Sequence, residues 1–89
     1  MVLSVAIRQR IINLTKLKNI SLKELSRRAG VPYPTLISFM SGANKTMNLS
    51  TLYGLCIGLD IDLVDFFDNR LFQDVLDEHE KETKYVMVM

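Results

Sequence analysis

Apolar side chains recur at helical spacing over the first eighteen residues. They lie at intervals of four, four and three, at Leu3, Ile7, Ile11 and Leu14, with polar and basic residues between them. This single apolar stripe predicts an amphipathic helix. Asparagine often terminates helices, so we expect this one to end near Lys18 and Asn19.

A second, short helix is predicted directly afterwards. Ser21 and Glu24 form a capping box, in which the serine hydroxyl accepts from the backbone N–H three residues on and the glutamate reaches back to the serine N–H. Ile20 and Leu25 stand at the hydrophobic staple positions. Gly30 closes the helix, because glycine adopts left-handed angles without a Cβ penalty.

Residues 31–40 supply a third helix, with Leu36 and Phe39 as its inward face and Ser41-Gly42 as its stop. Pro34 suits the first turn of a helix, although it disfavours helical angles at the residue before it.

A polar loop separates this helix from two more. We expect Ser50 to cap a fourth helix with its apolar face at Leu52, Leu55, Cys56 and Leu59, and Asp62 to cap a fifth. Phe66 and Phe67 in the fifth helix are predicted to fill the core.

The predicted fold is therefore all-α, with a five-helix domain over residues 1–70 and a C-terminal extension over residues 71–89. Leu71, Phe72, Val75 and Leu76 form an apolar stripe in the extension that packs on the first helix or meets a partner chain. Residues 85–89 have strand-like composition without polar alternation, which favours a frayed terminus over a pairing strand.

The two signs of charge are segregated along the chain. Residues 1–59 contain eight Lys and Arg and one Glu, a net charge of +7, whereas residues 60–89 carry −6. A basic front half suits a polyanionic partner, although ordinary surface charge explains the asymmetry equally well.

The residue types present do not indicate a metalloprotein, an enzyme or a membrane protein. Cys56 sits in an apolar stretch and is expected to be buried, and His79 has no second histidine or cysteine nearby, so we expect no metal and no cofactor. No nucleophile, base or glycine-rich phosphate motif indicates an enzyme or a small-molecule substrate. No apolar run reaches the roughly 20 residues of a membrane span, and we expect a cytoplasmic protein.

The helical segments resemble a known family. Residues 21–42 read SLKELSRRAGVPYPTLISFMSG, and residues 48–67 read NLSTLYGLCIGLDIDLVDFF. In this register they resemble the helix-turn-helix of the phage Cro and lambda-type repressor group, also called the XRE family. The resemblance covers about residues 3–70 and implies a lambda-repressor-like fold.

The resemblance also implies a DNA-binding site. In this family the third helix, here about residues 33–41, reads base edges in the major groove, and the start of the second helix and the loop after the third grip phosphates. The positions that match are, for the groove, Tyr33, Pro34, Thr35 and Ser38, with Ile37 beside them; for phosphate, Ser21 and Leu22; and in the loop, Asn44, Lys45 and Thr46. Arg27 and Arg28 match more weakly. The third helix departs from the usual pattern, because it has none of the Arg, Lys, Gln or Asn residues that usually read bases.

The expected function is a sequence-specific transcriptional regulator, a repressor of phage or bacterial origin, that binds double-stranded DNA as a homodimer. The stripe at residues 71–76 is the candidate dimer contact. The alternative is a protein-interaction module, such as the antitoxin of a toxin–antitoxin pair, with the acidic C-terminal third holding its partner.

Overall fold

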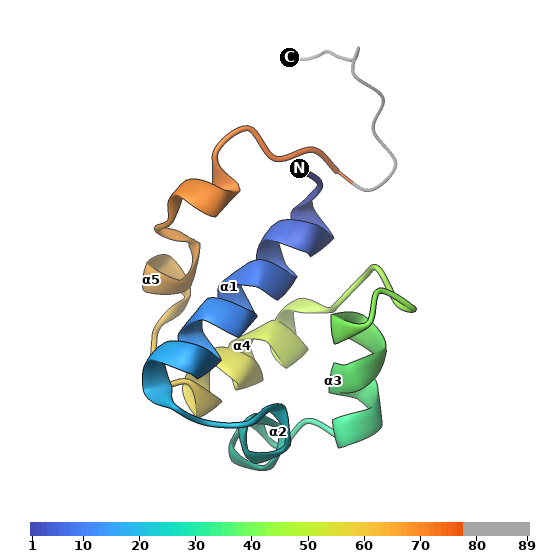
Figure 1. The fold of residues 1–89 in the computed structure, drawn as a ribbon, viewed down its shortest axis with the longest axis vertical. Coiled ribbons are helices and arrows are strands. Elements are labelled where there is room, and N and C mark those ends of the chain that lie inside the picture. Colours follow the sequence, from blue (N-terminus) through green and yellow to red (C-terminus); the bar gives the residue numbers. More distant parts are fainter. Residues whose placement is uncertain (78–89) are drawn as a thin grey trace.

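Five α-helices and a short 3-10 helix make up the described part of the chain. A computed structural model describes residues 1–77. They contain α1 (Leu3–Lys18), α2 (Leu22–Ala29), α3 (Tyr33–Met40), α4 (Leu49–Gly58), α5 (Leu63–Phe67) and the 3-10 helix η1 (Arg70–Phe72). The predicted all-α fold is confirmed. In Figure 1, α1 runs through the middle of the molecule, with α3 on one side and α5 on the other. His79 and the strand-like segment 85–89 lie outside the described residues.

Most helix ends follow their local signals. α1 ends at Asn19, whose left-handed φ of 56° turns the chain, and α2 ends at Gly30 with φ 68°. Ser21 caps α2 by accepting from the Glu24 backbone N–H at 3.0 Å, and the Asp62 side chain caps α5 in the same way. These caps each satisfy a backbone donor that a helix start leaves without a partner.

Two predicted helix starts were wrong. α4 is capped by Asn48, whose Oδ1 accepts from the Thr51 N–H at 2.8 Å, whereas Ser50 lies inside the first turn. Asn and Ser cap equally well, so local sequence could not choose between positions two residues apart. α3 begins at Tyr33, as the family resemblance implies, and not at residue 31, as the apolar pattern indicates; Val31 is buried in the turn before Pro32, which is the N-cap.

The core lies where α1, α2, α3 and α4 meet. Its fully buried side chains come from all five α-helices and include the predicted Leu36, Leu55 and Cys56. Of the two adjacent phenylalanines only Phe66 is buried, since Phe67 keeps 37 % of its surface exposed and packs edge-on against Phe72 at 4.8 Å between ring centres. The expectation that both rings fill the core was therefore wrong for Phe67.

The start of the extension folds back onto α1 within one chain. η1 packs against α1, and the backbone of Leu76 pairs with the N-terminus, where Leu3 N–H donates to Leu76 O at 2.8 Å and Leu76 N–H donates to Met1 O at 3.1 Å. This is an isolated bridge between Val2 and Leu76. Packing on the first helix is therefore seen for the start of the apolar stripe at residues 71–76, whereas Leu76 keeps 39 % of its surface exposed.

Candidate nucleic-acid interface

A three-residue turn sets the angle between α2 and α3. Gly30 takes the left-handed conformation, Val31 N–H donates to Ser26 O at 3.1 Å, and Pro32 has the extended angles of an N-cap residue. Pro34 is the second residue of α3, where its missing N–H costs nothing because the first turn has no intrahelical acceptor. The turn thus places α3 at the edge of the molecule (Figure 1), with Leu36 and Phe39 in the core.

α3 divides cleanly into a buried and an exposed face. Leu36 and Phe39 are buried at 0 % and 2 % exposure, whereas Tyr33, Pro34 and Thr35 are exposed. Ile37 and Ser38 are half-buried. Within residues 1–77 no segment covers the outer face of α3, which lies at the edge of the molecule in Figure 1. The hydroxyl groups on this face can both donate and accept hydrogen bonds.

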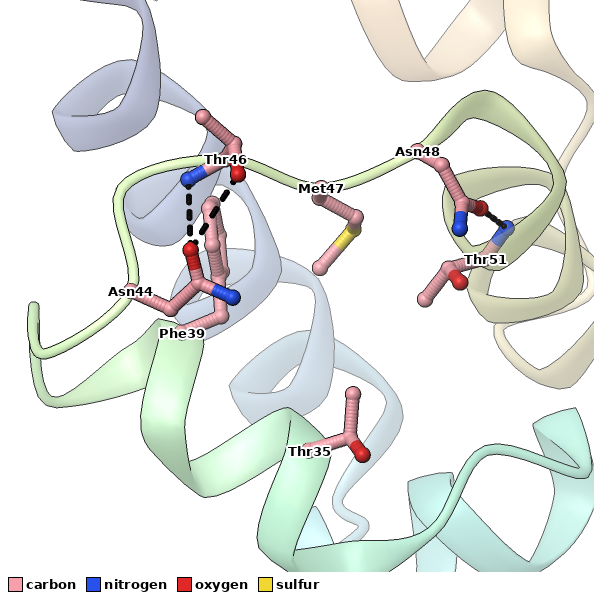
Figure 2. A pocket seen from close by; sticks show the side chains of 7 residues that line it. All are labelled: Thr35, Phe39, Asn44, Thr46, Met47, Asn48 and Thr51. Carbon is pink, nitrogen blue, oxygen red and sulfur yellow. Dashed lines mark hydrogen bonds between the residues drawn. The ribbon is translucent and has the colours of Figure 1, made fainter.

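The loop after α3 brings predicted site residues together. An open hollow of about 250 Å³ is lined by Thr35 from α3, Asn44 and Thr46 from the loop, and further by Phe39, Met47, Asn48 and Thr51. Figure 2 shows these side chains around the hollow. Asn44 Oδ1 accepts from the N–H of Thr46 at 3.1 Å and from its hydroxyl at 3.2 Å, which shapes the loop. Lys45 lies exposed between these two residues.

Sequence reasoning missed Asn48 and Thr51 as part of this surface. They start α4 at the hollow that Thr35 and the loop also line, and backbone N–H groups at a helix start favour anions. The preference for asparagine at a helix N-cap could have indicated Asn48, but Ser50 was expected to be the cap.

The start of α2 lies beside the start of α3. Ser21 is exposed and caps α2, and Leu22, the first helical residue, is half-buried. Lys23 holds its ammonium 5.9 Å from the centre of the Tyr33 ring, which places both helix starts on one surface. The two predicted phosphate-gripping elements therefore flank α3.

Half of the basic side chains in residues 1–59 donate hydrogen bonds to other groups of the protein. Arg27 and Arg28 pair with Glu24, so Glu24 does not complete the predicted capping box. The hydrogen bonds from Arg27 and then Arg28 lower the pKa of Glu24 to about 2. Arg8 and Arg10 donate to backbone carbonyls of α3 and α5. With Lys23 over the Tyr33 ring, the cations of residues 1–59 for which no such contact is seen are Lys16, Lys18 and Lys45.

The described part of the chain was also compared with the requirements of a metal site, a reactive thiol and a membrane-spanning helix. Residues 1–77 hold no group of three His, Cys, Asp or Glu that could bind a metal ion. Cys56 is fully buried, and burial raises the pKa of its thiol. Among the helices described, none has the length and apolar character to cross a membrane.

Comparison with known proteins identifies the domain. A family model described as the Cro/C1-type HTH DNA-binding domain matches residues 10–69, about two-thirds of the chain. No curated protein sequence matches. The matched family is one of DNA-binding regulators, which are not typically enzymes, and the domain supports double-stranded DNA as the partner. The matched region spans the outer face of α3 and the elements that flank it, and the chain belongs to the Cro/C1-type helix-turn-helix family.

Proposed function

We propose that the protein is a sequence-specific transcriptional repressor of phage or bacterial genes that inserts α3 into the major groove as a homodimer. One observation carries this proposal: the exposed face of α3 stands uncovered by residues 1–77, between the start of α2 and the loop after α3. A major groove about 12 Å wide admits a helix presented in this way. Such a regulator acts in the cytoplasm, where phage and bacterial DNA is transcribed.

Base reading on this face rests on small polar groups. Thr35, Ser38 and Tyr33 offer hydroxyls to base edges, and Pro34 offers an apolar contact to a thymine methyl. None of them makes the bidentate contact of an arginine or a glutamine, so we expect DNA shape to carry part of the specificity.

Phosphate binding rests on the flanking elements. The helix-end N–H groups at Ser21 and Leu22 and the loop residues Asn44, Lys45 and Thr46 surround the proposed groove helix. Lys45 is the one full positive charge in this set, and it is exposed. We therefore assign to Lys45 the largest share of the salt dependence.

For the dimer contact we propose the outer face of α4 and α5. The start of the stripe at residues 71–76 packs on α1 through η1. Leu49 and Val64, by contrast, are each 77 % exposed, and Tyr53 and Ile57 extend the same face along α4. Leu49 and Val64 also line one open apolar hollow with Leu63 and Phe67. Exposed apolar side chains that adjoin one another can mark a protein contact. A dimer that binds successive major grooves must hold its two α3 helices about 34 Å apart.

The test is DNA binding measured by fluorescence anisotropy, using a duplex that the wild-type protein selects from a random-sequence pool. We expect affinity to fall steeply with salt. Lys45→Ala should weaken binding to every duplex alike and lower the salt slope by about 0.9, the value for one phosphate contact. Ser38→Ala should change preference at one base step and leave the slope as it is.

Arg70→Ala serves as the control, because Arg70 is an exposed cation on η1, far from α3 in Figure 1. It should bind DNA as the wild type does. A protein-interaction module would show no selected sequence and no salt-dependent affinity. Unchanged binding by both Lys45→Ala and Ser38→Ala would remove the site assignment.

A further inference from the structure

The guanidinium of Arg8 reaches from α1 to the last turn of α3. Its Nε donates to the backbone carbonyl of Phe39 at 2.7 Å, and its Nη2 donates to the Ser4 hydroxyl at 3.3 Å. The guanidinium carbon also lies 5.3 Å from the centre of the Phe39 ring. At Gly42 a Cβ would meet Nη2 at 3.7 Å, so the turn after α3 lies against the same group. Arg8 is thus in contact with both the end of α3 and the turn that follows it.

These contacts satisfy a need that α3 cannot meet alone. The last carbonyls of a helix carry partial negative charge and have no intrahelical donor, and a nearby cation stabilises them. α3 has no basic residue in its last turn. The Phe39 carbonyl accepts from Arg8 and also from the Gly42 N–H at 3.1 Å. The carbonyl of the preceding residue, Ser38, accepts from the Asn44 N–H at 3.0 Å. The same short segment therefore connects the arginine to the loop at residues 43–46.

We infer that Arg8 is a positioning residue for DNA recognition, which holds α3 and the loop at residues 43–46 in one relative orientation without touching DNA itself. The inference rests on the proposed function of α3. The Nε donor of Arg8 is committed to the Phe39 carbonyl and the side chain is half-buried, so its charge serves the helix end and not a phosphate. Loss of the guanidinium frees the turn that joins the base-reading helix to the phosphate-gripping loop.

Arg10 provides a matched control within the same helix. Its Nε donates to Phe66 O at 2.8 Å, its Nη2 donates to Asp65 O at 2.8 Å, and its guanidinium carbon lies 6.0 Å from the centre of the Phe66 ring. The arrangement repeats that of Arg8, but it holds the end of α5, on the side of the molecule away from α3 (Figure 1). The two arginines differ chiefly in which helix they secure.

The experiment compares Arg8→Gln, Arg8→Lys and Arg10→Gln with the wild type, at a temperature where circular dichroism shows each to be folded. Two duplexes of equal length are titrated: the sequence selected by the wild type and an unrelated sequence. We expect Arg8→Gln to lose about tenfold in affinity for the selected duplex, as for loss of a charge-assisted hydrogen bond, and little for the unrelated one. Arg8→Lys keeps the charge and one donor, so it should lose less, and it replaces Arg8→Gln if that variant does not fold.

Two further readouts separate positioning from other roles. The salt slope of Arg8→Gln should equal that of the wild type, whereas a direct phosphate contact would lower it by about 0.9. Hydrogen exchange of the Gly42 and Asn44 amides should accelerate in Arg8→Gln, since their acceptors lie at the released end of α3. Arg10→Gln should lower the melting temperature but leave the exchange of the Gly42 and Asn44 amides as in the wild type, because Arg10 secures α5 and not α3.

Exchange of the Gly42 and Asn44 amides that accelerates as much in Arg10→Gln as in Arg8→Gln would overturn the inference. So would wild-type affinity of Arg8→Gln for the selected duplex, or a lowered salt slope in that variant. These results differ from failure of the proposed function, in which the wild-type protein itself selects no duplex.

Discussion

Replacing Gly58 by alanine tests how closely α4 approaches α2. A Cβ at this position would lie 3.1 Å from the backbone nitrogen of Ala29, 3.1 Å from Leu25 Cδ1 and 3.2 Å from Ala29 Cβ. Non-bonded carbon atoms prefer roughly 3.5–4.0 Å, so each neighbour must move by a few tenths of an ångström. The leucine methyl can do so. Ala29 cannot move as easily, because the turn after α2 is tied by the hydrogen bond from Val31 N–H to Ser26 O.

Two effects of opposite sign decide the outcome. Alanine is favoured over glycine inside a helix by about 1 kcal/mol, and overpacking a core costs about 1–3 kcal/mol. Two of the three close contacts are with Ala29, at the end of α2, so we expect overpacking to win and the free energy of unfolding to fall by about 1 kcal/mol. For a domain of this size that lowers the melting temperature by roughly 4–8 °C.

The assay is urea and thermal unfolding, followed by circular dichroism, of the wild type, Gly58→Ala, Ala29→Gly and the double variant. Ala29→Gly removes one of the atoms that the new Cβ meets. The double variant should therefore be more stable than the sum of the single changes, by about 0.5 kcal/mol or more. A coupling free energy of zero between the two substitutions, or a higher melting temperature for Gly58→Ala than for the wild type, would refute the close approach of α4 to α2.

Two further predictions concern helix ends. Asn48→Ala should destabilise the protein by about 1 kcal/mol, because the Thr51 N–H loses its acceptor. Asn48→Asp keeps an acceptor and should stay near the wild type. The urea midpoint measures both variants, and an equal loss of stability in the two would contradict the cap. Glu24 has a folded pKa of about 2, below its usual 4.5, because Arg27 and then Arg28 donate to it, so its contribution to stability is full above pH 4.5 and is lost as pH falls toward 2. The difference in melting temperature between wild type and Glu24→Gln should shrink over that window and with added salt, and a constant difference would contradict the ion pair.

The candidate site was predicted in part. The exposure of Tyr33, Pro34 and Thr35 follows from the positions of Leu36 and Phe39, because a helix with one apolar face exposes the other. The hollow shared by Thr35, the loop and the start of α4 did not follow, since the path of a polar loop is not encoded in a periodic pattern.

The positions of the helices along the chain follow from the amino-acid sequence alone, because the signals that start and stop a helix act within three or four residues. Ser21, Gly30 and Asp62 illustrate this, since each makes its capping contact with its immediate neighbours. One N-cap was predicted at Ser50 but lies at Asn48; both residue types cap well, and the two lie only two positions apart.

Contacts between distant residues became visible only in three dimensions. Arg8 meets a carbonyl 31 residues away and Arg10 one that is 56 residues away, so neither could be distinguished by sequence from a surface cation. The return of Leu76 to the N-terminus and the close approach of Gly58 to α2 likewise depend on how the helices pack. Local hydrogen bonding sets the helices, whereas their mutual orientation, and with it the surface offered to DNA, arises from long-range packing that no short pattern specifies.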